Sequence, residues 1–168
     1  MRTTSQSSGK IPKPIPTESQ PQDAIALLIE DHETVKSLFE QYEELGDRAH
    51  VSKHKLALQI CEELTRHTMI EEEIFYPAVR KAIKDDDIMD ESLVEHASAK
   101  DLIAQIQSME PTEDLFDAKV KVLSEMIDHH VEEEETEMFP KVRKTKLDLE
   151  ELGQAMAERK EEIQLPPV

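Results

Sequence analysis

The chain has 168 residues, a formal net charge of −18 and one cysteine, Cys61. Such an acidic chain repels the phosphates of nucleic acids and anionic membrane surfaces, so neither is expected as a partner. A single cysteine excludes an intramolecular disulfide, and we expect Cys61 to fill a small core position in a reducing compartment. No apolar run approaches the roughly 18 residues of a membrane span, and no secretory signal is evident, so a soluble cytoplasmic protein is expected.

The composition favours an all-helical protein. Glycine occurs only 3 times and aromatic residues make up 4% of the chain, whereas Glu, Lys, Leu, Ile and Ala are abundant. Residues 1–20 are rich in Ser, Thr, Gln and Pro and are predicted to be a disordered tail. We expect one domain over residues 21–163, followed by a short tail at 164–168. A domain of that size can bury a core without disulfides.

Two helices are predicted in the first half. The first begins near Asp23 and ends at Gly46, and one face carries Ile25, Leu28, His32, Val35, Phe39 and Tyr42. The second covers about 50–83, and one face carries Leu56, Ile60, Leu64, His67, Glu71, Ile74, Phe75 and Ala78. Pro77 is expected to kink or break this helix near its end, because proline removes a backbone donor.

Three helices follow. The third begins at Asp85–Asp87, and one face carries Met89, Leu93, His96, Ala99, Ile103 and Ile106. The fourth runs from about 113 to 137 or beyond, with Thr112 as the expected N-cap, and one face carries Phe116, Val120, Leu123, Ile127, His130, Glu134 and Met138. A short fifth helix covers about 148–163. Four long amphipathic helices with short connections predict an antiparallel up-down-up-down four-helix bundle.

A repeated His–Glu motif lies on these apolar faces. Glu71 follows His67 by four residues, and Glu134 follows His130 by four. Pro77 and Pro140 each lie ten residues after the histidine, and a lone histidine precedes each copy: His32 by 35 residues and His96 by 34. Residues four apart project from one side of a helix. If these faces point inward, four imidazoles and two carboxylates meet in the core.

Buried carboxylates require compensation, because an unpaired charge in the core costs several kcal/mol or is neutralised by a pKa shift. A pair of metal cations supplies that compensation. Imidazole and carboxylate ligands suit Fe, Mn or Zn, and carboxylates between two metals without thiolates point to a di-iron centre. Neither the HExxH motif of zinc metalloproteases nor the Glu-x-x-His motif of ferritin-like bundles is present.

The pattern of His32, His67-xxx-Glu71, His96 and His130-xxx-Glu134 resembles the hemerythrin-like (HHE cation-binding) family over about residues 23–163. The resemblance implies a four-helix bundle that holds two iron ions, bridged by oxo or hydroxo, and reacts with O2, peroxide or nitric oxide. The implied ligands are His32, His67, Glu71, His96, His130 and Glu134. The form H-HxxxE-H-HxxxE is similar to bacterial hemerythrin-like proteins that are linked to peroxide breakdown and nitric-oxide responses.

Some positions depart from the oxygen carriers of that family. Lys100 stands where those carriers have a further histidine, so a more open metal that performs chemistry is expected rather than simple O2 carriage. Glu134 and Glu135 are both candidates for the bridging carboxylate. Further candidates are His129, as a metal ligand or a hydrogen-bond partner of one, and Tyr42, as a hydrogen-bond donor to a bound small molecule. A metal-bound histidine usually donates its other N–H to a carboxylate, and Asp31, Glu63 and Glu95 are candidates for such an outer partner.

Two other functions remain compatible with the sequence. The same site could serve a non-catalytic oxygen or nitric-oxide sensor or an iron buffer, which would bind its ligand or release iron without turnover. Alternatively, the bundle could be an interaction module that is loaded with zinc or free of metal. For a di-iron protein that reacts with a small oxidant, peroxide disproportionation is the most concrete reaction.

Overall fold

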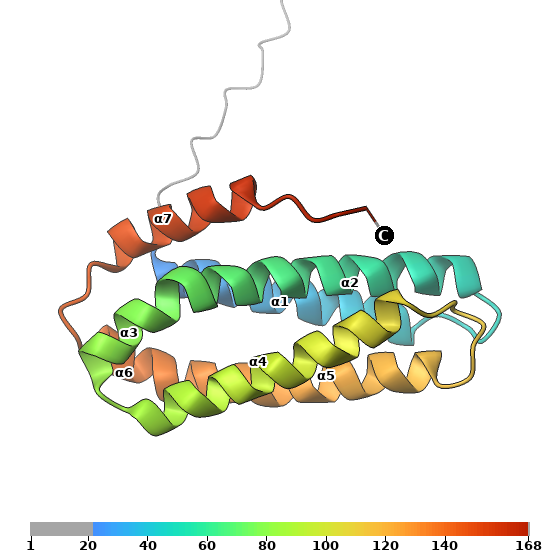
Figure 1. Cartoon of the computed structure of the whole chain (residues 1–168), viewed down its shortest axis with the longest axis horizontal. Coiled ribbons are helices and arrows are strands. Elements are labelled where there is room, and N and C mark those ends of the chain that lie inside the picture. The colour runs from blue at the N-terminus through green and yellow to red at the C-terminus, as the bar shows by residue number, and fades with distance from the viewer. Residues whose placement is uncertain (1–21, 168) are drawn as a thin grey trace, which may run out of the picture.

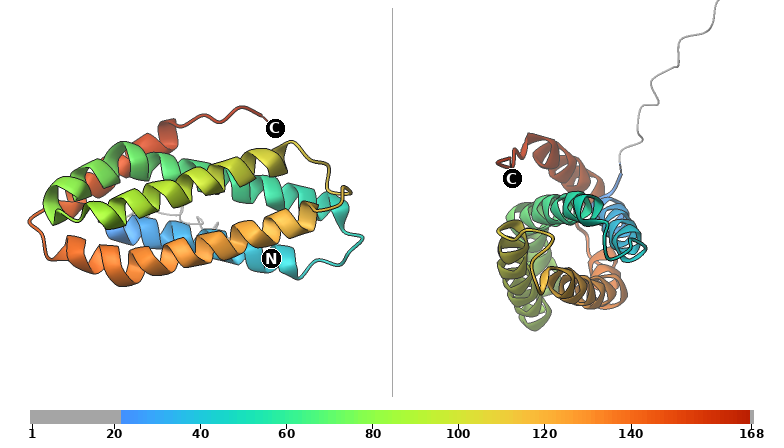
Figure 2. Two further views of the ribbon diagram at one scale, coloured as in Figure 1. Left: turned by 60° about the horizontal axis from the view of Figure 1, so that its bottom comes forward. Right: turned by 90° about the vertical axis from the view of Figure 1, so that its right-hand side faces the viewer.

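A computed structural model describes residues 22–167, and the predicted tail at 1–20 lies outside them. The helices are α1 (Ala24–Glu43), α2 (His50–Ile70), α3 (Tyr76–Ile83), α4 (Asp86–Gln107), α5 (Phe116–Glu133), α6 (Phe139–Arg143) and α7 (Leu149–Glu162). Figure 1 shows that α2 continues into α3, and α5 into α6, so that four antiparallel rods result. The end-on view in Figure 2 shows these rods around one centre with α7 outside. The predicted four-helix bundle with a short fifth helix is confirmed.

Two π-helical turns join the helix pairs. The turn η1 (Glu71–Phe75) links α2 to α3, and η2 (Glu134–Met138) links α5 to α6. In each, an N–H bonds a carbonyl five residues earlier, as from Tyr76 to Glu71. Near Pro77, where a kink or break was expected, this wider turn interrupts the regular helix, and α-helix resumes at Tyr76 and continues to Ile83. The same arrangement precedes Pro140.

Aspartates begin three of the helices. The side chains of Asp23, Asp85 and Asp148 accept hydrogen bonds from backbone N–H groups of the first turns of α1, α4 and α7. The expectation that Thr112 caps the fourth helix is wrong. Here α5 begins at Phe116 after Leu115, whose φ of 73° lies in the left-handed region, with no side-chain cap.

The helix stop predicted at Gly46 is also displaced. The helix α1 already ends at Glu43, and a turn separates it from the glycine. Gly46 does not adopt a positive φ, so it is not a left-handed cap. The boundary moves by three residues, which leaves the inner face of α1 unchanged.

The apolar core consists of two clusters at opposite ends of the bundle. One gathers around α3, α6, α7 and the start of α1, with Phe75 and Met138 fully buried. The other fills the end where α1 meets α2, and it contains Cys61 at 0% exposure, as expected of a small core residue. Leu93 was expected on an inner face but is 39% exposed, and Ser92 is buried beside it. The candidate metal ligands belong to neither cluster and lie between them.

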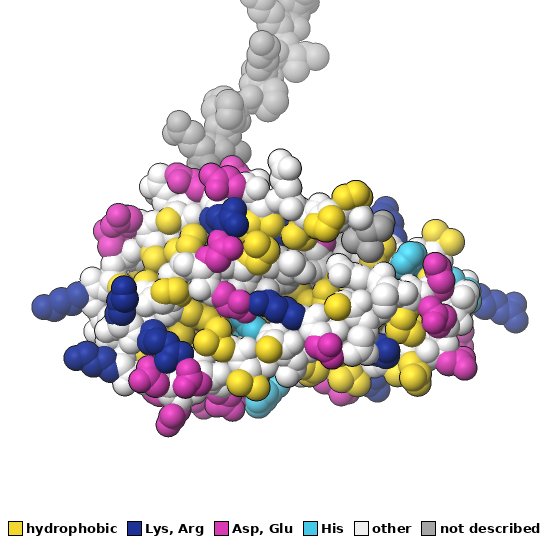
Figure 3. All heavy atoms as spheres, viewed as in Figure 1, with side chains coloured by type: hydrophobic (Ala, Val, Ile, Leu, Met, Phe, Trp, Pro, Cys, Tyr) yellow, Lys and Arg dark blue, Asp and Glu magenta, His cyan; other side chains and the backbone are white. Residues whose placement is uncertain are grey.

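Helix α7 packs across α1, α2 and η1 on the outside of the bundle (Figure 1). The contact is closest at Gly153, where a Cβ atom would lie 2.4 Å from the backbone oxygen of Gln22 and 2.7 Å from the backbone nitrogen of Ala24. On the face drawn in Figure 3, acidic and basic side chains are interspersed. Within residues 22–167, no helix is both long and apolar enough to cross a membrane.

Replacing Gly153 by Ala should lower the free energy of unfolding by about 1–3 kcal/mol, because the new methyl group overlaps backbone atoms that cannot rotate away. Gly46 is the matched control. No atom lies within 4 Å of the position that its Cβ would take, so Gly46→Ala should change stability by less than about 0.5 kcal/mol. Urea unfolding of both variants measures the difference, and equal stabilities would contradict the close packing of α7.

Candidate metal centre

Six buried residues from all four rods meet between the two apolar clusters. Every one of them is at most 6% exposed. They are His32 from α1, His67 and Glu71 from α2 and η1, His96 from α4, and His130 and Glu134 from α5 and η2. The structure thus brings together all six residues that the repeated motif singled out.

The two carboxylates lie between two pairs of histidines. Glu71 presents Oε1 at 3.2 Å from Nε2 of His67 and Oε2 at 3.2 Å from Nε2 of His96. Glu134 presents Oε2 at 3.2 Å from Nε2 of His32 and Oε1 at 3.4 Å from Nε2 of His130. Each carboxylate therefore faces both halves of the bundle, which is the arrangement needed to bridge two cations.

Two positions for a cation follow from these contacts. We call the first position the space among His32, His67, Glu71 and Glu134, and the second position the space among His96, His130 and the other oxygens of the same two carboxylates. Donor atoms of the first four residues lie within 4.8 Å of one another, and the same holds for Glu71, His96 and His130. The first position offers two imidazole nitrogens and two carboxylate oxygens, and the second offers two imidazole nitrogens and an oxygen of Glu71, with Oε1 of Glu134 at 3.4 Å from Nε2 of His130.

The first position contains buried donor atoms without a hydrogen-bond partner. These atoms are Nε2 of His32, Nε2 of His67, Oε1 of Glu71 and Oε2 of Glu134. Buried polar atoms are rarely left unsatisfied, because each costs about 1–3 kcal/mol. All four point into one space and alternate between nitrogen and oxygen, so the residues fit a metal ion.

A carboxylate lies behind each histidine. The Nδ1–H groups of His32 and His96 donate to Glu135 and Glu72, both at 2.9 Å. The remaining two bonds join Nδ1 of His67 to Asp31 at 3.2 Å and Nδ1 of His130 to Glu95 at 2.5 Å. Such partners hold the proton on Nδ1 and aim the Nε2 lone pair at a metal.

The hydrogen bonds to Nδ1 of the histidines show where the acidic candidates from the sequence lie. Glu135 binds the outer nitrogen of His32, so Glu134 is the carboxylate placed between the histidines. Asp31 and Glu95 are outer partners as suggested, whereas Glu63 instead lies 4.0 Å from Lys160. Glu72 was not foreseen, although it directly follows Glu71 just as Glu135 follows Glu134. The acidic residue that directly follows each glutamate of the motif was the signal in the sequence that could have pointed to Glu72.

The other sequence candidates lie outside the centre. His129 has a side chain that is 62% exposed and that faces Glu95 and Glu133. Lys100 forms an ion pair with Glu72 at 2.6 Å and so supports an outer carboxylate, as Lys160 of α7 does for Asp31. Tyr42 lies in the far apolar cluster and donates a hydrogen bond to Asp117.

Tyr76 enters the centre at the second position, and the sequence analysis did not single it out. Its hydroxyl donates to Oε1 of Glu134 and lies 3.2 Å from Nε2 of His96 and 3.4 Å from Nε2 of His130. Phe139 occupies the equivalent place near the first position, where its ring stacks on His32 with centroids 6.0 Å apart. The two positions therefore differ by one hydroxyl group.

Protons compensate the carboxylates when no metal is bound. Burial lowers the pKa of His67, but the charges of Glu71 and Asp31 outweigh burial and raise that pKa to about 10. For His130, burial is likewise outweighed, mainly by Glu134, and the pKa rises to about 11. Burial raises the pKa of Glu134, yet His130 and His32 hold it well below its ordinary value. Metal and protons thus compete for the same donor atoms.

An apolar void adjoins the centre on the side away from Tyr76. Its walls include all four histidines, together with Val35, Leu64, Thr68, Ile127 and Val131. It leaves about 10 Å³ for the centre of a water-sized molecule, enough for about one such molecule. A molecule of about the size of water can therefore lie against the histidines without displacing a side chain.

A helical bundle with a buried cluster of histidines and glutamates that fits a metal centre defines the class of this protein. The sequence profile of the family named hemerythrin HHE cation binding domain matches residues 23–142, so the chain belongs to that family. A crystal structure of an HHE cation-binding domain-containing protein from Mycobacterium kansasii has a similar fold, with a TM-score of 0.71 and 26% identity over 84% of this chain and 86% of that one.

A curated relative carries a different name. A protein from Nostoc sp. named DNA nickase is 31% identical over 122 residues, which make up 73% of this chain and 33% of that protein. This chain therefore spans about a third of that relative. The expectation of no nucleic-acid partner stays a prediction, and it rests on the net charge of −18.

Metal binding should release the protons of His67 and His130, because their pKa values of about 10 and 11 keep both imidazoles protonated at pH 7. Affinity for a divalent cation should consequently increase as the pH rises from 6 to 9. Titration calorimetry of the metal-free protein with Zn²⁺, repeated in buffers of different ionisation enthalpy, measures the protons released. A heat that does not depend on the buffer would contradict this result.

Proposed function

We propose that this chain binds two iron ions at the first and second positions and reacts with a small oxidant, with peroxide disproportionation as the leading reaction. The observation that supports it is the set of buried, unpartnered nitrogen and oxygen atoms at the first position. Nitrogen and oxygen ligands without thiolate suit iron, although they do not exclude zinc or manganese. When bound, two irons would supply the redox chemistry: one peroxide would take two electrons and two protons and become two waters, and a second peroxide would return them and leave as O2.

The histidines and shared carboxylates would hold the metals. His32 and His67 would bind at the first position, His96 and His130 at the second, and Glu71 and Glu134 would contribute one oxygen to each. The outer carboxylates keep each Nε2 aimed inward and make the imidazoles stronger donors. Because all six side chains are buried, water has little access to the centre.

Two features of the protein favour chemistry at this centre over simple storage. The apolar void beside the histidines has room for a molecule of about the size of water. On the opposite side, the Tyr76 hydroxyl donates to Oε1 of Glu134 and lies 3.4 Å from Oε2 of Glu71, so its proton would reach a molecule in the void by way of a shared carboxylate. Splitting peroxide requires proton movement, and a positioned donor accelerates such steps by about 10²–10⁴-fold.

A sensor or iron buffer on the same site is the alternative. It would bind O2 or nitric oxide stoichiometrically, or release iron, without repeated turnover. Iron-loaded protein mixed with excess peroxide separates the two, since an enzyme evolves O2 over many cycles and a sensor does not. Zinc in the purified protein, and no uptake of Fe(II), would instead support an interaction module.

Neighbouring histidines provide a matched test of the ligand assignment. His130→Gln removes a donor of the second position, so the iron content should fall from two per chain to one or fewer, and the near-ultraviolet absorption of the paired irons should be lost. His129→Gln changes the adjacent, 62% exposed side chain and should leave both unchanged. Metal analysis and absorption spectra of the two variants decide the question. Full iron content in His130→Gln would refute the proposed ligand.

Tyr76→Phe tests the proposed proton donor. The variant makes the second position resemble the first, where Phe139 already lies. Iron content should stay at two per chain, because the phenol oxygen is not among the proposed ligands, while the rate of peroxide breakdown should fall about tenfold or more. The oxygen evolved from peroxide, measured on samples of equal iron content, gives the rate. An unchanged rate would exclude Tyr76 from proton transfer.

A further inference from the structure

A buried metal centre needs a route by which metal enters. The six side chains of the centre are at most 6% exposed, so an ion cannot bind without passing protein atoms. A plausible metal site is expected to have such an entry path. The question is where the bundle offers one.

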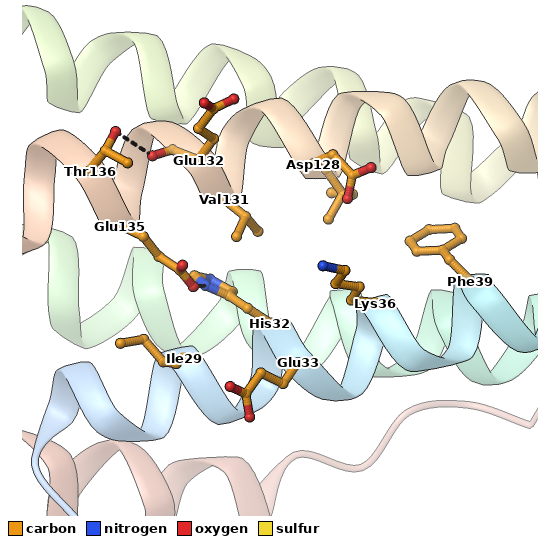
Figure 4. Close-up of a pocket in the computed structure, with 11 residues that line it drawn as sticks. Ile29, His32, Glu33, Lys36, Phe39, Asp128, Val131, Glu132, Glu135 and Thr136 are labelled. Carbon is orange, nitrogen blue, oxygen red and sulfur yellow. Dashed lines mark hydrogen bonds and ion pairs between the residues drawn. The ribbon is translucent and has the colours of Figure 1, made fainter.

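An open groove of about 490 Å³ runs between α1 and α5 and reaches the centre at His32 (Figure 4). His32 is the one member of the six that lines this groove, and it is 6% exposed. Its Nε2 has no hydrogen-bond partner and faces the first position. Ile127 and Val131 line both the groove and the inner void, so the groove and the void adjoin at these residues.

Acidic side chains dominate the walls of the groove. Four carboxylates line it, from Glu33, Asp128, Glu132 and Glu135, and the one basic residue is Lys36. All five of these side chains are exposed. A cleft lined by one sign of charge concentrates counter-ions and raises association rates by about 10–10³-fold. This groove therefore attracts cations and repels anionic oxidants.

Glu135 lies at the inner end of the groove. Its side chain is 38% exposed, and its Oε1 accepts a hydrogen bond from Nδ1 of His32 at 2.9 Å. Figure 4 shows the two side chains meeting from opposite walls. A carboxylate placed there can contact a cation in the groove and, by releasing His32, can let that imidazole turn toward the ion.

We propose that the acidic groove between α1 and α5 is the entry path for divalent metal ions, with Glu135 and His32 as the gate to the first position. The inference depends on the proposed metal centre but concerns how fast metal arrives rather than whether it stays. Equilibrium metal content therefore tests the centre, and the rate of uptake tests the path.

The experiment uses metal-free protein that contains all 168 residues of the sequence, mixed with Fe(II) under anaerobic conditions. After set delays, a chromogenic chelator captures the unbound metal and gives the rate of uptake. A triple variant, Glu33→Gln, Asp128→Asn and Glu132→Gln, keeps the shape of the groove, and at low ionic strength it should take up Fe(II) about tenfold more slowly. Lys36→Gln should take it up faster. Salt should reduce both differences, since the field is screened.

The matched control changes three exposed acids at the other end of α1: Glu43→Gln, Glu44→Gln and Asp47→Asn. Two of these line a neighbouring groove that shares Phe39 with the entry groove but contains no residue of the centre. This control has the same net charge as the groove variant and should load at the wild-type rate. Equal rates in the groove variant and the wild type, or equal slowing in the control, would overturn the entry path. Failure of the wild type to retain any metal would instead overturn the proposed function.

Discussion

Two ionised carboxylates in the middle of the core constrain everything around them. Glu71 and Glu134 are 0% and 1% exposed, and removing such groups from water costs several kcal/mol each unless they are paired. The surrounding imidazoles provide that pairing directly. Carboxylates then hold the imidazoles, and lysines hold two of those carboxylates: Lys100 at Glu72 and Lys160 at Asp31. The alternation of charge thus extends from the centre of the bundle to its surface.

The same constraint explains the backbone. Each shared carboxylate projects between the rods, and an aromatic ring covers the centre just beyond it. The π-helical turn places the carboxylate and the ring on the same, inward face of the rod. It directs Glu71 and Tyr76 to the same side, five residues apart, and does the same for Glu134 and Phe139. The two apolar clusters then seal the centre from either end, which keeps the local dielectric low and the electrostatic interactions strong.

Much of this arrangement was predictable because it repeats. Helical periodicity gave the four rods, and the paired spacing of His67 with Glu71 and of His130 with Glu134 identified the residues that meet. Tyr76 was missed because a residue five positions after Glu71 falls on another face of a regular α-helix. The position of Glu72 directly after Glu71 marked it as a possible partner of a ligand, but its pairing with His96 joins different rods and depends on how they pack. Helix ends such as that of α5 are set by local turns that many sequences can form.

The aromatic residues that follow the two π-helical turns differ by a single oxygen atom, since Tyr76 on one side is matched by Phe139 on the other. The halves of the centre otherwise repeat each other closely in residue type and spacing. That oxygen makes the two positions of the centre chemically unequal. A hydroxyl can exchange a proton with the shared carboxylates and a phenyl ring cannot, so protons would pass to and from the centre on the side of the second position alone.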